Sequence, residues 1–240
     1  MPSDGGPSGV ELSATPLAER LAVVRSRIAD AAAEAGRDPA SITTIVVTKF
    51  HPLGLVRQLI DLGVTDFGEN RHQEAQVKAA ELAALHPDVP VWWHFIGQLQ
   101  SKKARQVRAY ASAIHSLDRD SVIDALASGD VPIDSFVQLN LTDDPGRGGV
   151  SEADLERVAQ RVLDTDGLRL LGVMAVAPVG EDPRAAFERV RAASIRVRSI
   201  APEARFISAG MSGDYREAIL EGATHLRIGS AITGIRPTGG

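Results

Sequence analysis

ITTIVVTKFHPLGLVRQLIDLGVTDFGEN, residues 42–70, contains the pattern of a strand, a helix and a second strand. The β-branched run Ile45–Thr48 predicts the first strand. A helical pattern follows it from about Pro52, and the run centred on Asp66–Phe67 predicts the second strand. Because two strands joined through a helix pair in parallel, this stretch predicts one unit of an α/β fold.

The same alternation continues to the end of the chain. The strand runs are centred on Ile45–Thr48, Asp66–Phe67, Trp92–Ile96, Ala113–Leu117, Ser135–Leu141, Leu168–Val176, Arg205–Ser208 and His225–Ile228. The helical patterns between them begin near Pro52, Arg71, Ser101, Arg119, Ser151, Asp182 and Asp214. Eight units with a mean repeat of about 26 residues predict a single (β/α)8 TIM barrel. A doubly wound open sheet is the structural alternative, although it normally has fewer strands.

Composition narrows the function classes. The chain has 240 residues, 44% hydrophobic and 24% charged, with a net charge of −5 and no cysteine. Disulfides, thiolate metal sites and cysteine nucleophiles are therefore excluded, and bulk charge does not favour a nucleic-acid partner. No apolar run approaches the length of a membrane span, and the N-terminus lacks the pattern of a signal peptide, so we expect a cytoplasmic protein without membrane partners.

The N-terminal region precedes the first strand. Residues 1–9 are rich in Gly, Ser and Pro and are expected to form a disordered tail. Apolar residues at spacings of three and four then predict an extra helix from about Pro16 to Ala35. We expect residues 10–240 to form one barrel domain.

Lys49 closes the first strand run. In a (β/α)8 barrel the chemistry lies at the C-terminal ends of the strands, where the polar side chains of several strands converge. A lysine at the end of a buried strand is costly unless its ammonium finds partners or loses its proton, and a neutral amine is what imine formation needs. The alternative is a lysine whose ammonium simply extends to solvent.

Two Gly/Ser segments follow the seventh and eighth runs. Gly210 and Gly213 flank Ser212 in the first segment, and Gly229-Ser230 begins the second. Loops at these two places form the usual phosphate site of this barrel, so the pair predicts phosphate binding; plain helix capping is the alternative for each alone. Arg227, within the eighth run, points either into the barrel mouth or outward to a salt bridge.

Other candidates are weaker. His94 lies in the third strand run and His115 ends the fourth, so we expect both among the polar groups that converge at the mouth of the barrel. The six histidines show no metal-ligand spacing, so we expect no metal site. The glycines at 146, 148 and 149 lack the context of a dinucleotide-binding motif. The basic turn at 102–108 is typical of a solvated helix face.

Jointly, these motifs resemble the pyridoxal-phosphate homeostasis protein family, the proline-synthetase-associated type, which is similar to the N-terminal domain of alanine racemase. The resemblance spans about 190 residues, in order. The matching stretches are VVTKF (46–50), DFGENRHQEA (66–75), WHFIGQLQSKK (93–103), IHSLDR (114–119), VQLNL (137–141), GVMAVAP (172–178) and AGMSGDYREAILEGATHLRIGSAITG (209–234).

The resemblance implies a fold-type III barrel that binds pyridoxal 5′-phosphate (PLP) as an internal aldimine on Lys49. It implies that Arg227 faces the pyridine nitrogen and that Asn70 lies at the cofactor's edge. The phosphate is expected on the loops after the seventh and eighth strands, at Met211, Ser212, Gly213, Gly229 and Ser230. The chain departs from the family pattern at Phe50, at Arg71-His72, at Ser230 and at Thr233.

Two functions follow from this resemblance. The first is a PLP-binding protein that takes part in intracellular PLP homeostasis without established catalysis, with PLP-dependent apo-enzymes as candidate recipients, as a monomer or weak homodimer. The second is an amino-acid racemase of the alanine racemase type. That reaction needs a tyrosine acid/base opposite the lysine, and we expect neither Tyr110 nor Tyr215 to lie there. We therefore expect no enzyme.

Overall fold

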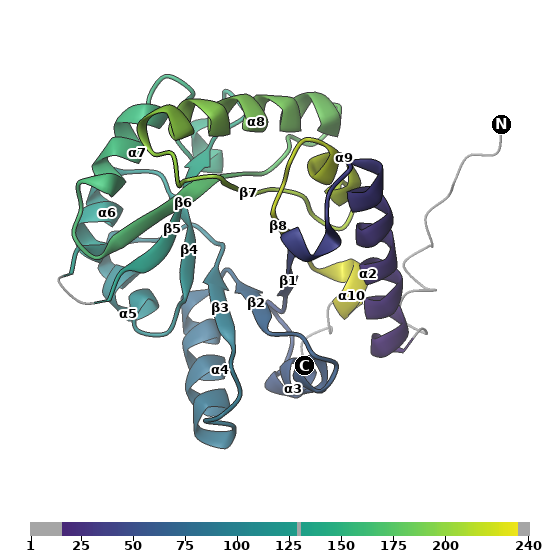
Figure 1. The fold of residues 1–240 in the computed structure, drawn as a ribbon. Helices are drawn as coiled ribbons and strands as arrows, with labels where there is room; N and C mark the ends of the chain where they lie inside the picture. The colour runs from purple at the N-terminus through teal and green to yellow at the C-terminus, as the bar shows by residue number, and fades with distance from the viewer. Residues whose placement is uncertain (1–15, 129–130, 235–240) are drawn as a thin grey trace.

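The computed structural model describes residues 16–128 and 131–234, which form a closed barrel of eight parallel strands surrounded by helices (Figure 1). The expected disordered tail, residues 1–9, lies outside the described residues. The strands are β1 Thr43–Val47, β2 Asp66–Glu69, β3 Trp92–Phe95, β4 Ala113–Leu117, β5 Ile133–Leu139, β6 Leu168–Ala175, β7 Phe206–Ser208 and β8 His225–Ile228. The α-helices are α2 Leu17–Glu34, α3 Leu53–Asp61, α4 His72–Leu85, α5 Ala104–Arg108, α6 Asp120–Leu126, α7 Leu155–Leu163, α8 Pro183–Ile200, α9 Tyr215–Leu220 and α10 Ser230–Thr233. Three short 3₁₀ helices complete this part of the chain, η1 Pro39–Ser41, η2 Ser101–Lys103 and η3 Pro145–Arg147.

Strand order follows chain order, and the first strand pairs with the last. Thr43 lies opposite His225, and Val46 lies opposite Ile228. This pairing closes the sheet, so the predicted (β/α)8 barrel is confirmed and the open-sheet alternative is wrong. All eight predicted strand runs are strands, with boundaries that differ by at most three residues.

The helices begin close to the predicted positions, except that α5 and α7 begin three and four residues later than predicted. Asp182 caps α8 by accepting a hydrogen bond from Arg184 N at 3.2 Å, with Pro183 at the first helical position. The delay at the segment expected from Ser151 arises because Ser151 and Asp154 first form a turn, closed by Asp154 N donating to Ser151 O at 3.1 Å. The segment expected from Ser101 first forms η2 and becomes α-helical at Ala104.

The predicted N-terminal helix is confirmed as α2. Its buried face consists of Leu21, Val24, Ile28, Ala31 and Ala32, at the helical spacing that the sequence shows. In Figure 1, α2 lies along α9 and α10, next to the seam where β1 meets β8. An amphipathic helix that buries this face against the last helices covers the side of the barrel where the chain closes.

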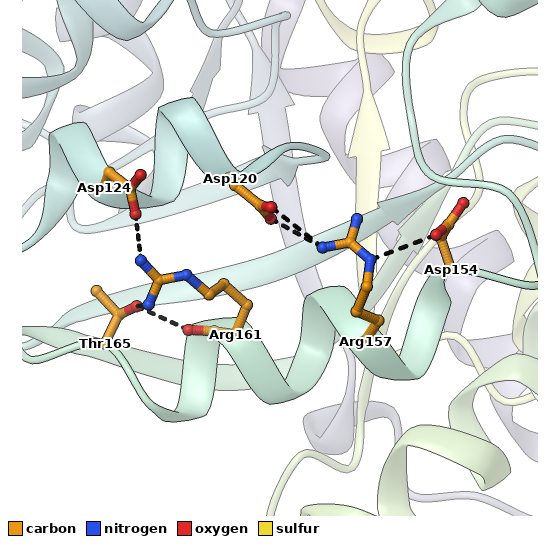
Figure 2. A network of polar contacts seen from close by, with 6 residues as sticks. All are labelled: Asp120, Asp124, Asp154, Arg157, Arg161 and Thr165. Carbon is orange, nitrogen blue, oxygen red and sulfur yellow. Dashed lines mark hydrogen bonds and ion pairs between the residues drawn. The ribbon is translucent and has the colours of Figure 1, made fainter.

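Exposed arginines link α6 to α7 on the outer surface (Figure 2). Arg157 donates to Asp120 at 3.1 Å and to Asp154 at 3.3 Å, and Arg161 donates to Asp124. Arg161 also donates to the hydroxyl of Thr165 at 3.2 Å. Solvent screens exposed pairs of this kind, so they fix the orientation of two helices more than they stabilise the fold.

Within the described residues, no helix combines the length and the hydropathy that a membrane span requires.

Candidate functional site

Lys49 lies two residues after the end of β1, at the C-terminal end of the barrel, as predicted. Its side chain is half-buried, with Nζ 5.9 Å from the centroid of the Phe50 ring. Phe50 has φ of 67°, and it is the one described non-glycine residue with a positive φ. A bulky residue adopts this conformation only when its surroundings hold it there, so the turn after Lys49 is strained.

Two residues of α4 hold the backbone on both sides of Lys49. Lys78 Nζ donates to Thr48 O at 2.8 Å, and Phe50 N donates to Glu74 Oε1 at 2.6 Å. Glu74 and Lys78 are four residues apart on one helix face and pair with each other at 2.6 Å. We call Glu74 and Lys78 the Lys49 clamp, because they fix the peptide groups before and after this lysine.

Glu69, at the end of β2, completes the buried polar cluster. Its Oε1 accepts from Lys78 Nζ at 2.8 Å and from the Thr48 hydroxyl at 2.7 Å, while its Oε2 is buried without a partner. Burial raises the pKa of Glu69, against the opposing effect of Lys78 and Thr48. Removing Lys78 would leave the carboxylate of Glu69 buried without its counter-charge, whereas Lys78 is also paired with Glu74.

Asn70 follows Glu69 and brings an unpartnered polar atom to the same region. Its Oδ1 is buried without a hydrogen-bond partner in the structure. Gly97, after β3, lies so close that an added Cβ would sit 2.3 Å from Asn70 O and 2.7 Å from Asn70 Cβ. The loops after β2 and β3 therefore touch, and glycine at 97 is what permits the contact.

The loops after β7 and β8 lie side by side. Ala231 N donates to Ser212 Oγ at 3.3 Å, which joins the two predicted phosphate segments. Asp214 Oδ1 accepts from Met211 N at 2.6 Å and shapes the first loop. Burial raises the pKa of Asp214, and this hydrogen bond and Arg227 oppose that effect.

The joined loops can receive an anion through their backbone. None of the hydrogen bonds among the described residues uses the amides of Ser212, Gly213 or Ser230 as donors. A Cβ added to Gly213 would meet nothing within 4 Å, so the backbone there is open to a ligand. The helices that follow, α9 and α10, are short, so the free amides rather than a long helix dipole make this place suitable for a phosphate.

Arg227 points into the barrel and not outward. It is 4% exposed, and its Nη1 donates to Ser208 Oγ at 2.7 Å while its Nη2 donates to Ala175 O at 2.7 Å. Burial lowers the pKa of Arg227 to about 10, although Asp214 opposes this effect, so the guanidinium is charged at neutral pH. Of the two orientations that the sequence left open, the inward one is observed.

The structure does not bring every expected residue to the mouth. His94 and His115 were expected among the polar groups converging there, but they contact each other inside the barrel, and His94 pairs with Asp66 at the beginning of β2. They face inward because histidines at these strand positions alternate with residues that pack against the helices. No group of three or more His, Cys, Asp or Glu among the described residues is arranged to hold a metal.

The Lys49 clamp was missed by sequence reasoning. Glu74 and Lys78 have the i, i+4 spacing of an ordinary exposed helix pair, which gives no sign of their burial. The usable signal is their position within the DFGENRHQEA motif and just after it, directly behind the second strand.

Comparison with known proteins identifies the family of this chain. Residues 21–237 match the family model of the alanine racemase N-terminal domain. A pyridoxal phosphate homeostasis protein of Corynebacterium glutamicum is 38% identical over 225 residues, which cover 89% of this chain and 99% of the relative. The chain belongs to the pyridoxal phosphate homeostasis protein family. Another family member, from Pseudomonas aeruginosa, is 38% identical over 231 residues, covering 93% of this chain and 97% of the relative.

Solved structures extend the comparison from family to fold. PipY of Synechococcus elongatus, solved with PLP bound, has a TM-score of 0.78 and 32% identity and covers 91% of this chain and 100% of its own. A protein from Bifidobacterium adolescentis has a TM-score of 0.84 and 29% identity, with 90% and 94% covered. Alanine racemase of C. glutamicum, at 15% identity and a TM-score of 0.66, shares the fold; 92% of this chain covers 60% of the racemase.

Proposed function

We propose that this protein binds PLP covalently through Lys49 and takes part in PLP homeostasis without turning over a substrate. One observation carries the proposal: the hydrogen bond between Ala231 and Ser212 joins the two predicted phosphate loops, and β8, which precedes the second loop, pairs with the strand that leads into Lys49. The names of the family members and the PLP held by PipY support it.

The described residues fit the groups of this cofactor. Open backbone at Gly213, the free amides of Ser212 and Ser230, and their hydroxyls suit a phosphate, with Met211 and Gly229 shaping the two loops. The unpartnered Oδ1 of Asn70 is a polar contact available at a ring edge. Arg227, charged and buried, is the group we assign to the pyridine nitrogen.

The same residues argue against a racemase. Bound PLP supplies an electron sink, which works best when its ring nitrogen is protonated. The permanent charge of Arg227 disfavours a proton at that nitrogen. Tyr215 is buried in the first turn of α9, and the buried hydroxyl of Tyr110 has no partner. Burial also raises the pKa of Tyr110, so neither tyrosine is suited to act as the second proton-transfer group.

The remaining parts of the proposal concern surroundings and partners. We place the protein in the cytoplasm, as a monomer or weak homodimer, with PLP-dependent apo-enzymes as recipients of the cofactor. The absence of cysteine and the net charge of −5 support this environment and disfavour nucleic acid.

The test is covalent capture at a single residue. Purified protein is incubated with PLP, reduced with borohydride and digested, and the modified peptide is identified by mass spectrometry. We expect the adduct on Lys49 in the wild type and in Lys102→Ala, an exposed lysine on η2, and none in Lys49→Ala. An adduct spread over surface lysines, or none at Lys49, would overturn the assignment.

Turnover is measured on the same preparations. Wild type loaded with PLP is incubated with L-alanine, and the two enantiomers are separated over time. The proposal expects the L form to persist. Racemisation at ordinary enzymatic rates, lost in Lys49→Ala, would establish the racemase function instead.

A further inference from the structure

The interior of this barrel is polar where barrels of this kind are usually filled with branched apolar side chains. His94, His115, Ser208 and Arg227 are 7%, 0%, 0% and 4% exposed. Burying polar groups is costly unless each one finds a hydrogen-bond partner. These four side chains, which come from β3, β4, β7 and β8, satisfy one another in a single chain of contacts.

The chain of contacts runs through the barrel from Arg227 to Asp66. Ser208 Oγ lies 2.7 Å from Arg227 Nη1 and 2.8 Å from His115 Nδ1. His115 Nε2 lies 3.0 Å from His94 Nδ1. His94 Nε2 lies 3.0 Å from Asp66 Oδ1. We call Ser208, His115, His94 and Asp66 the interior relay.

For imidazoles that each carry one hydrogen, the chemistry of the two ends gives a single direction for the hydrogen bonds. A guanidinium only donates, so Ser208 Oγ accepts from Arg227 and its own hydrogen goes to His115 Nδ1. His115 then carries its hydrogen on Nε2 and donates to His94. His94 in turn donates from Nε2 to the carboxylate of Asp66. In this arrangement every hydrogen has an acceptor.

Asp66 places the far end of the relay beside solvent. It begins β2, at the N-terminal end of the barrel, and its side chain is 23% exposed. A cavity of about 190 Å³ opens there, and its lining includes Asp66, His94, Asp134 and His225. The relay thus spans the barrel from this cavity to the arginine below the proposed cofactor site.

Several titratable groups surround His94. Asp66 faces it from β2, His115 from β4 and His225 from β8, and Asp134 of β5 lines the same cavity, paired with Arg169. Burial lowers the pKa of His225 to about 4. Burial also lowers the pKa of His115 well below its usual range. Both are therefore neutral at pH 7.

Asp66 is ionised at the far end of the relay. Burial raises its pKa, but the hydrogen bonds from His94 and Thr65 lower it by more, so the net direction is downward and Asp66 is a carboxylate at neutral pH. A proton added to His94 would make both of its nitrogens donors. His115 would then have to move its hydrogen to Nδ1, and Ser208 would lose its acceptor. The two ends of the relay are therefore linked through its hydrogen bonds.

We infer that the interior relay positions Arg227 and links the hydrogen bonding of this arginine to the cavity at the opposite end of the barrel. Ser208 and His115 are positioning residues in this view, and Asp66 is the terminal acceptor. The inference rests on the proposed function, which assigns Arg227 to the pyridine nitrogen of PLP.

The first experiment uses the full chain without PLP. Long-range ¹H–¹⁵N correlation spectra at neutral pH report which ring nitrogen of each histidine carries the hydrogen. We expect His115 and His94 both with the hydrogen on Nε2, and a change in the signals of both rings in Ser208→Ala. A hydrogen on Nδ1 of His115 in the wild type, or His94 signals untouched by Ser208→Ala, would overturn the relay.

The second experiment measures the pH midpoint of the visible absorption band of the PLP-loaded protein. Asp66→Asn replaces the carboxylate at the end of the relay with a weaker acceptor, which weakens each hydrogen bond along it and leaves the charge of Arg227 less well balanced. A less balanced positive charge disfavours the protonated form of the band, so the midpoint is expected to shift to lower pH. Asp134→Asn is the matched control, because Asp134 lines the same cavity but is not in the relay. It is expected to leave the midpoint unchanged.

A double mutant separates the relay from charge acting through space. If the effect of Asp66 travels through the hydrogen bonds, Asp66→Asn gives no further shift in a Ser208→Ala background. Additive shifts, or equal shifts in Asp66→Asn and Asp134→Asn, would overturn the inference. If wild type forms no visible band with PLP, the proposed function fails, and the inference that rests on it falls with it; the spectra without PLP still show separately whether the relay exists.

Discussion

Glu74 accepts a hydrogen bond from the backbone amide of Phe50 at 2.6 Å, one residue after Lys49. Phe50 has the left-handed φ of 67°, and this hydrogen bond is one of the contacts that hold it there. On the other side of Lys49, Lys78 donates a hydrogen bond to the carbonyl of Thr48. The helix after β2 therefore holds the backbone on both sides of the lysine that follows β1. The position of Lys49 is thus set by a neighbouring unit of the barrel.

Removing the buried cation of the Lys49 clamp should destabilise the fold. Lys78→Met leaves Glu69 and Glu74 without their partner, and breaking a buried pair costs about 3–5 kcal/mol. Urea unfolding measures this change. Lys102→Met, the same substitution at an exposed position, should stay within about 0.5 kcal/mol of wild type.

We attribute the loss of stability in Lys78→Met to the buried carboxylate of Glu69, which loses its counter-charge. A second variant measures the contribution of this carboxylate. Adding Glu69→Gln to Lys78→Met should restore much of the lost stability, since the buried carboxylate is then gone. Equal unfolding free energies for Lys78→Met and the double mutant would show that the ion pair between Lys78 and Glu69 does not contribute to stability.

The two loop serines should differ in their effect on PLP affinity. Ser230→Ala removes a hydroxyl that we assign to the phosphate, a charge-assisted bond of roughly 1.5–3 kcal/mol, or about tenfold or more in affinity. Ser212→Ala removes a similar bond and also the link to Ala231, so its loss should be larger. PLP titration followed by absorbance measures both, with exposed Ser101→Ala as control. Unchanged affinity in both loop variants would remove the phosphate assignment.

Glycine at 97 should be indispensable while glycine at 54 is not. In Gly97→Ala the new Cβ would meet Asn70 O at 2.3 Å, so the loop must move and carry Asn70 with it. We expect lower thermal stability and weaker PLP binding. Gly54→Ala, in α3, meets nothing within 4 Å and should be neutral or stabilising by up to about 1 kcal/mol. A tolerated Gly97→Ala with unchanged affinity would contradict this role of the contact.

Acid should destabilise the protein through the buried histidines. The pKa of His225 is about 4 in the folded state, lowered from 6.5, so only the unfolded chain takes up this proton between those values. Stability is therefore full above pH 6.5 and falls as the pH drops towards 4, by on the order of 3 kcal/mol for this group. His115 acts in the same direction.

Urea unfolding between pH 4 and 6.5 tests whether the free energy of unfolding falls as the pH is lowered. His225→Asn should flatten the dependence of unfolding free energy on pH, by about 1.4 kcal/mol per pH unit at most, because one titrating group is gone. A variant that keeps the full slope of the wild type would assign the acid sensitivity to other groups.

The repeat of strands and helices was predictable because its signals are local. β-Branched runs and helical spacing mark each element, and the barrel rule then places Lys49, Ser212 and Ser230 at one end. The structure confirms that β1 and β8 pair and that the two serine-bearing loops meet. The pairing of the strands and the meeting of the loops both follow from the order of the strands, and neither depends on which way a side chain points.

Contacts between distant units could not be predicted in this way. Lys78 lies on a helix among polar residues, and only the packing of α4 against β1 and β2 shows that it is 5% exposed. His94 and His115 were expected at the mouth because they lie at strand ends in the sequence. The register of β3 with β4 pairs His94 with Ala113, and the two imidazoles meet inside the barrel.

The pairing of β1 with β8 has a consequence for synthesis. Lys49 and the loop at Ser230 lie about 180 residues apart in the chain, and they become neighbours only when the last strand seals the first. A nascent chain on the ribosome carries the lysine long before it carries Arg227. The two parts of the proposed site therefore come together only after translation has delivered the eighth strand, and an unfinished chain lacks the assembled site.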